Sequence, residues 1–175
     1  MNPVESAALR LQDLAVLWSV GECRAADVVD AACDALVAGL DSPGLRVLAA
    51  CTRAEADYDV HDLLPPALDE LGLVHYPFGD EDSAPEAAAR ALARRMLAGE
   101  STPREFARRV HARYGHGPAL TERVAELDDE YDVVEYGNGT AADIDAEVIA
   151  EARRLAAVGV RGSQSDGSGD LADRA

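Results

Sequence analysis

Apolar residues along the chain recur every three or four positions, which is the spacing of one face of an α-helix. The first such stripe contains Leu11, Leu14, Ala15 and Trp18. Asn2 and Pro3 precede it as a capping residue and a first helical residue, and Gly21 follows it where a helix would end. These positions predict a helix that begins near residue 3 and ends before Gly21.

The same periodicity and end signals predict seven further helices. Their expected ranges are 25–38, 43–52, a short helix that ends near 71, 83–98, 102–114, 118–127 and 140–155. Pro65 and Pro66 should lie in the first turn of the short helix, because a deeper proline removes a backbone hydrogen bond. Ser83 should cap the next helix in a capping box with Glu86. The sequence thus predicts an all-α fold, a helical bundle of about eight helices.

Two segments interrupt the helical pattern and predict the domain organisation. The segment 74–82 contains Pro77 and Gly79 and has no helical periodicity, so we expect a connector between two halves. From residue 159 onward, Gly, Ser and Asp follow one another without an apolar pattern, which is typical of disorder. We therefore expect a single helical domain over 1–158 and a disordered tail over 159–175.

An internal similarity relates the two halves. Gly21 and Glu22 correspond to Gly99 and Glu100, and the segment 57–60 (Asp-Tyr-Asp-Val) corresponds to 130–133 (Glu-Tyr-Asp-Val). We interpret 14–60 and 92–133 as copies of one unit, with two helices around a Gly-Glu turn, a third short helix and an acidic exit. Packed together, they should form a pseudo-twofold bundle with the two Tyr-Asp-Val segments in related positions.

The charge of the chain restricts its partners. There are 33 acidic residues against 16 basic ones, all arginine, and the formal net charge is −17. A negative field of this size repels phosphate backbones and steers basic proteins toward the surface, so we expect no direct contact with nucleic acid. Acidity that serves only solubility is the plainer alternative.

Acidic residues are densest in two segments, and these are the candidate partner-binding residues. The first set is Asp128, Asp129, Glu130 and Asp132, and the second is Glu55, Asp57 and Asp59. Carboxylates at this density can dock the arginines and lysines of a protein or bind a divalent cation. The spacing lacks the central glycine of a calcium loop, so we expect no metal. Solvated helix ends are the other interpretation.

No other motif indicates catalysis or a cofactor. His111 and His116 are five residues apart with Gly115 between them, and on a continuous helix they would face different directions. No Ser, Thr or Cys stands in a nucleophile motif, and no glycine-rich loop follows a strand. We therefore expect no cofactor and no catalytic residue recognisable from sequence, although scattered carboxylates could still assemble into an active site.

The cysteines and the hydropathy indicate the compartment. Cys23, Cys33 and Cys51 are odd in number and lie in apolar stretches, so we interpret them as small core residues of a reducing compartment. No segment reads as a leader peptide or approaches the roughly 18 apolar residues of a membrane span. These features predict a cytoplasmic protein without a membrane partner.

One stretch resembles a known family. The segment 92–107, with Gly99 and Glu100 in its turn and Thr102 and Pro103 opening its second helix, is similar to the helix-turn-helix start of small helical immunity proteins of bacterial nuclease toxins, the colicin immunity type. The resemblance implies an acidic helical protein that masks a basic toxin active site. It carries over no toxin-contacting residue.

These observations favour a non-enzymatic acidic protein-binding module, an immunity or regulatory protein that docks on a basic partner. The alternative is a small-ligand-binding protein or an enzyme that uses carboxylates in a cleft between the two halves. A subunit of a homo-oligomer with a structural role is a third possibility.

Overall fold

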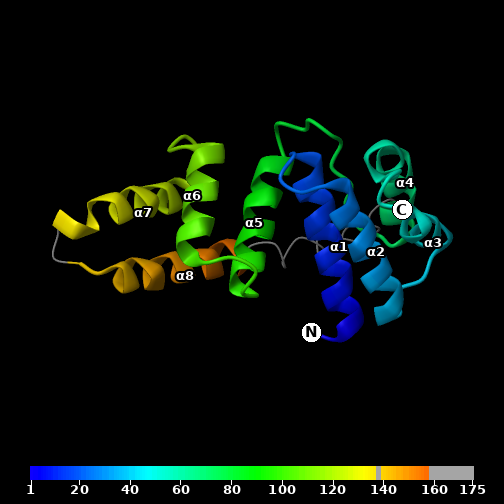
Figure 1. Cartoon of the computed structure of the whole chain (residues 1–175), viewed down its shortest axis with the longest axis horizontal. Helices are drawn as coiled ribbons and strands as arrows, with labels where there is room; N and C mark the ends of the chain where they lie inside the picture. Colours follow the sequence, from blue (N-terminus) through cyan, green and yellow to red (C-terminus); the bar gives the residue numbers. More distant parts are fainter. Residues whose placement is uncertain (137–138, 158–175) are drawn as a thin grey trace, which may run out of the picture.

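The computed structural model describes residues 1–136 and 139–157 (Figure 1). The described residues form eight α-helices and one short 3₁₀ segment and contain no strand, which confirms the all-α bundle. The helices are α1 (Pro3–Ser19), α2 (Ala25–Ala38), α3 (Pro43–Ala50), α4 (Ala56–Glu70), α5 (Ala84–Leu97), α6 (Pro103–Tyr114), α7 (Glu122–Val133) and α8 (Ala141–Ala157), and η1 (Val134–Tyr136) follows α7. The tail predicted to be disordered, 159–175, lies outside the described residues.

Capping explains where α1 begins. At the start of α5 the hydrogen bonds differ from the expected capping box. The Asn2 side chain accepts a hydrogen bond from the Glu5 backbone N–H at 2.8 Å, and the Glu5 carboxylate accepts one from Asn2 at 3.0 Å. Ser83 forms no such box with Glu86. Its backbone N–H donates to the Asp80 carboxylate at 3.0 Å instead, and these bonds lower the pKa of Asp80. The predicted box is wrong because Asp80 already organises the turn before α5.

The course of α4 differs most from the sequence-based expectation. Pro65 and Pro66 lie well inside the helix rather than in its first turn. Each removes the hydrogen bond to the carbonyl four residues earlier, at His61 and Asp62, and both of these residues are exposed, so water can satisfy their carbonyls. The helix continues because its buried face runs past the prolines, through Val60, Leu64, Ala67 and Leu68.

Two apolar cores lie on either side of α1. One is formed by α1–α4 and the other by α5–α8, and α1 supplies side chains to both (Figure 1). Leu11 and Leu14 enter the first core, whereas Val16 and Leu17 enter the second. Five buried alanines of α5 keep its side chains small, so α5 packs against both α1 and α8: Ala84, Ala88, Ala89, Ala91 and Ala93. The two halves are therefore joined mainly through α1 and α5.

The two Gly-Glu turns have the same backbone geometry. Gly21 and Gly99 have φ values of +76° and +84°, which favour glycine. In both turns the glutamate N–H donates to the carbonyl five residues earlier, at 2.7 Å from Glu22 and 3.0 Å from Glu100. This likeness does not extend to the acidic segments. Tyr58 is exposed in the first turn of α4, whereas Tyr131 is buried near the end of α7 and donates a hydrogen bond to Asp145.

The Tyr-Asp-Val segments therefore do not occupy related positions, and the corresponding prediction is wrong. The geometry shared by the two halves is the helix-turn-helix, and a common origin of the halves stays a prediction.

The interpretation of the cysteines as core residues also fails in part, because Cys33 is exposed on α2. No helix among the described residues combines the length and the apolar character needed to cross a bilayer.

A close contact between α3 and α4 yields a test of the fold. A Cβ added at Gly44 would lie 3.0 Å from the backbone N and Cα of Ala67, which cannot move without shifting α4. We expect Gly44→Ala to lower the free energy of unfolding by about 1–3 kcal/mol in urea denaturation.

Gly117→Ala is the matched control, because its Cβ would meet nothing within 4 Å. It should leave stability unchanged or slightly higher. Equal stability of the two variants would contradict the described contact between α3 and α4.

Candidate functional site

The acids predicted in the second half lie within α7 and are already engaged by basic side chains. Arg123 contacts Glu130 at 2.8 Å, Glu126 at 3.0 Å and Glu147 at 2.5 Å. The hydrogen bonds that Arg123 donates to these carboxylates raise its pKa. The other three predicted acids of α7 also have basic neighbours. Asp128 and Asp129 face histidines, and Asp132 lies 3.8 Å from Arg104. A docking cation would have to compete with these internal contacts.

The acids predicted in the first half are presented differently. Glu55, Asp57 and Asp59 lie at the start of α4 and are exposed, as is Asp62 one turn further on. Glu55 accepts a hydrogen bond from the Thr52 hydroxyl at 2.6 Å, which lowers its pKa. In the described parts of the chain, no basic side chain forms an ion pair with these four acids.

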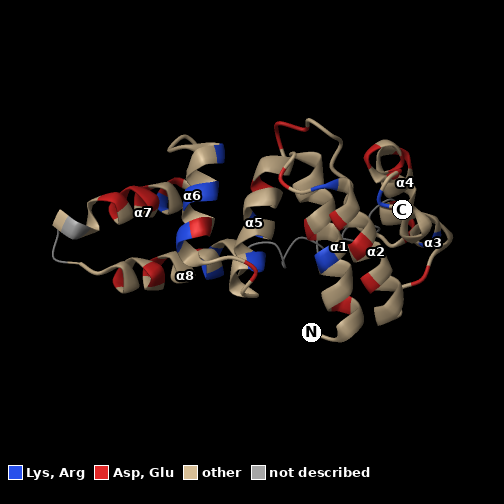
Figure 2. Ribbon diagram, in the orientation of Figure 1, with Lys and Arg blue, Asp and Glu red and all other residues tan. Residues whose placement is uncertain are grey.

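The arrangement of the arginines explains this difference. The first half contains four arginines, and each contacts an acid elsewhere: Arg10 with Glu100, Arg24 with Asp27, Arg46 with Asp41 and Arg53 with Asp30. Figure 2 shows blue positions gathered on α6, whereas α4 carries red ones. Among the described residues, the acids at the start of α4 therefore form no ion pair, because the neighbouring Arg53 contacts Asp30 instead.

Apolar side chains accompany these acids. A shallow groove between α3 and α4 is lined by Val47, Ala50, Cys51 and Leu63, with the carboxylates at its rim. Val47 is 54% exposed and the neighbouring Tyr58 is 82% exposed. Burial, and then the charges of Asp59 and Glu55, raise the pKa of the Cys51 thiol, so it stays protonated and is a poor nucleophile. We call Val47, Tyr58 and the four acids Glu55, Asp57, Asp59 and Asp62 the α4 face.

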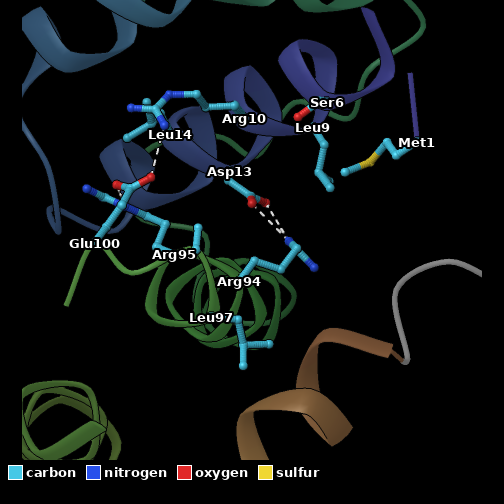
Figure 3. Close-up of a pocket in the computed structure, with 11 residues that line it drawn as sticks. Met1, Ser6, Leu9, Arg10, Asp13, Leu14, Arg94, Arg95, Leu97 and Glu100 are labelled. Atoms are coloured by element: carbon cyan, nitrogen blue, oxygen red, sulfur yellow. Dashed lines mark hydrogen bonds and ion pairs between the residues drawn. The ribbon is translucent and has the colours of Figure 1, made fainter. Parts of the chain in front are cut away.

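A second groove lies between the two halves (Figure 3). It has a volume of about 360 Å³ and is bordered by α1 and by the end of α5. Its apolar walls come from Leu9, Leu14 and Leu97, and the exposed Ser6 stands at its edge. Asp13 and Glu100 are its two carboxylates.

Arginines neutralise both carboxylates of this groove. Arg94 Nε donates to Asp13 Oδ2 at 2.9 Å, and Asp13 is almost fully buried. Glu100 contacts Arg10 and Arg95, each at 2.9 Å. Both carboxylates are thus engaged by arginine side chains and are not free to act on a ligand. The groove therefore suits a small ligand better than acid-base chemistry.

The Gly-Glu turns also connect the halves. Glu100, in the second turn, contacts Arg10 of α1, while Glu22, in the first turn, contacts Arg109 of α6 at 2.5 Å. Neither contact could be read from the sequence, because the partners are 90 and 87 residues apart. The shared Gly-Glu motif was the only available signal, and it marks the turns without identifying their partners.

The structure also brings together two histidines that the sequence separated. The rings of His111 and His116 lie with centroids 4.8 Å apart beside Asp128 and Asp129. The predicted helix ends at Tyr114, as α6 does, but the turn at Gly115 that brings His116 back beside His111 was not expected. A glycine between two histidines was the signal for this geometry.

A comparison of the chain with protein-family models, with curated proteins and with solved structures finds no match. The function of the chain is therefore inferred from the geometry of these sites.

The buried ion pair between the halves yields a prediction. Asp13→Ala leaves Arg94 without its carboxylate in a site where that side chain is 22% exposed, so it should lower the free energy of unfolding by about 3 kcal/mol. The double variant Asp13→Leu/Arg94→Met removes both charges and keeps the volume, and it should recover most of this loss.

Chemical denaturation of Asp13→Leu, of Arg94→Met and of the double variant measures the coupling. The exposed pair of Arg53 and Asp30 provides the control, and Asp30→Ala should change stability by less than about 1 kcal/mol. Strictly additive losses at Asp13 and Arg94 would show that the pair does not act as a unit.

Proposed function

We propose that the chain is a non-enzymatic acidic protein-binding module, and that the α4 face docks an arginine- or lysine-rich segment of a protein partner. The observation that carries the proposal is that none of the four exposed acids at the start of α4 forms an ion pair with a side chain of the described residues. Basic side chains of a partner would supply the missing opposite charge, and Val47 and Tyr58 would add apolar and aromatic contact.

The acids of α7 rank second as a docking surface. Asp128, Asp129, Glu130 and Asp132 remain candidate partner-binding residues, but their histidine and arginine neighbours reduce what a partner could gain. Since replacing one cation by another gives little net energy, we place the primary contact at Glu55, Asp57 and Asp59 together with Asp62.

Inhibition of a basic protein is the most concrete form of this function. The net charge of −17 and the helical fold agree with an immunity or regulatory protein that covers a basic surface. The same charge opposes direct nucleic-acid binding. We place the protein in the cytoplasm, without a membrane partner, and homo-oligomer formation remains compatible with the docking role.

A photocrosslinking experiment tests the α4 face. A photoreactive amino acid replaces Tyr58, the full chain is expressed in its native cells, and crosslinked proteins are identified by mass spectrometry. We expect crosslinks to proteins of high isoelectric point. The variant Asp57→Asn/Asp59→Asn/Asp62→Asn should bind the purified partner about ten-fold more weakly, since three exposed pairs contribute roughly 0.2–1 kcal/mol each.

The matched control changes the net charge equally at other exposed acids, as Asp34→Asn/Glu81→Gln/Asp82→Asn. It should retain most of the affinity, and binding by the parent should weaken with added salt. Crosslinks to acidic proteins only, or equal losses in both triple variants, would refute docking at this face.

The groove between the halves supports a second candidate, the binding of a small ligand. Its leucine walls and arginines suit an apolar organic anion, for which anilinonaphthalene sulfonate is a probe. We expect saturable one-to-one fluorescence binding that Ser6→Trp abolishes by filling the groove and that Ser6→Ala retains. Equal binding by both variants, with unchanged circular dichroism, would place the probe elsewhere.

A further inference from the structure

Four side chains at the junction of α6 and α7 form a cluster of nitrogen and oxygen donors. His111 lies in the last turn of α6, His116 in the following loop, and Asp128 and Asp129 on α7. Donor atoms of His111, His116 and Asp129 all lie within 4.8 Å of one another. Nδ1 of His111 is 3.0 Å from Asp128 Oδ2 and 3.7 Å from Asp129 Oδ1, and Nε2 of His116 is 3.1 Å from Asp129 Oδ2.

These separations match the ligand shell of a tetrahedral metal ion. Zinc binds imidazole nitrogen and carboxylate oxygen at about 2.0–2.2 Å, so two of its ligands lie about 3.3 Å apart. Three of the measured pairs are between 3.0 and 3.7 Å. Small side-chain movements would therefore bring His111, His116 and Asp129 to bonding distance of one ion, and Asp128 adjoins this group through its contact with His111.

The backbone explains how the donors converge. Gly115 ends α6 with φ +60° and ψ −152°, and its N–H donates to the His111 carbonyl at 2.8 Å. This conformation suits glycine and returns His116 toward the helix it has just left. Asp128 and Asp129 are neighbours on α7, which packs against α6. His111 and Asp128 are mostly buried, whereas His116 and Asp129 are about half exposed, so the cluster is open to solvent on one side.

We propose that His111, His116 and Asp129, with Asp128 as the fourth donor, bind a divalent transition-metal ion such as Zn²⁺. Mixed imidazole and carboxylate ligands suit Zn²⁺, Co²⁺, Ni²⁺ and Cu²⁺, whereas Ca²⁺ and Mg²⁺ prefer oxygen donors alone. Two neutral imidazoles and two carboxylates also compensate the charge of a divalent cation. The ion would tie the end of α6 to α7, and the site is separate from the α4 face.

The test is a titration of the purified, chelator-treated full chain, without an affinity tag, with ZnCl₂ in a calorimeter. We expect one ion per chain with a dissociation constant on the order of micromolar or tighter. Loss of an outer partner of a metal ligand already costs about 10–100-fold in affinity, so His116→Ala and Asp129→Asn should each weaken binding by at least about 100-fold. Zn²⁺ should raise the melting temperature of the parent and not that of His116→Ala.

Matched controls separate this site from others on the chain. His75→Ala removes a histidine of the connector between the halves, and Cys51→Ser removes the thiol that lies near Glu55 and Asp59 as a second possible donor group. Both variants should bind Zn²⁺ as tightly as the parent. Co²⁺ bound to the parent should give visible absorption bands but no band of thiolate-to-metal charge transfer.

Three results would overturn the proposal. These are no binding of Zn²⁺ by a chain whose circular dichroism is helical, undiminished binding by His116→Ala, and a Co²⁺ spectrum with thiolate bands that Cys51→Ser removes. The first result would leave the three histidine–aspartate contacts as contacts between side chains without a metal ion.

Discussion

The packing of α1 against α5 is the contact on which the rest of the structure depends. The chain builds two apolar cores instead of one, and α1 is the helix that supplies side chains to both. If α1 and α5 separated, the second core would lose Val16 and Leu17 of α1 and would expose the alanines of α5 to water. Charged contacts accompany this packing, because Asp13 meets Arg94 in the interface and each Gly-Glu turn contacts an arginine of the other half. These ion pairs set the relative position of the halves more than they add to stability.

Local patterns predicted the helices well and their packing poorly. Seven of the eight helices begin within four residues of their expected start, because capping residues, prolines and glycines act over one turn. The expected start of the fourth helix, α4, was wrong, because the proline rule describes a local cost. The apolar face of α4 through Val60, Leu64 and Leu68 is stabilised by contacts with other helices. The same limit applies to Tyr58 and Tyr131. Their neighbours in sequence are alike, but only Tyr131 lies against α8.

The candidate sites follow the same division. Sequence identified the two acidic segments but could not tell that Arg104, Arg123 and His111 would engage one of them and that no base among the described residues would form an ion pair with the other. That difference arises from the three-dimensional placement of a few bases among many acids. The meeting of His111 and His116 was missed for a related reason, because a helix end at Tyr114 does not show in which direction Gly115 turns the following chain.

The distribution of the bases gives the surface its functional asymmetry. With half as many basic as acidic residues, the chain cannot neutralise itself everywhere, and its arginines concentrate where they hold helices together. Arg94 and Arg109 join the halves, and Arg123 joins α7 to α8 through Glu147. Among the described residues no arginine pairs with the acids at the start of α4, because the neighbouring Arg53 contacts Asp30, and exposed Tyr58 and Val47 accompany these acids. Under the proposed docking role, these two side chains would add apolar contact that an acidic surface serving only solubility does not require.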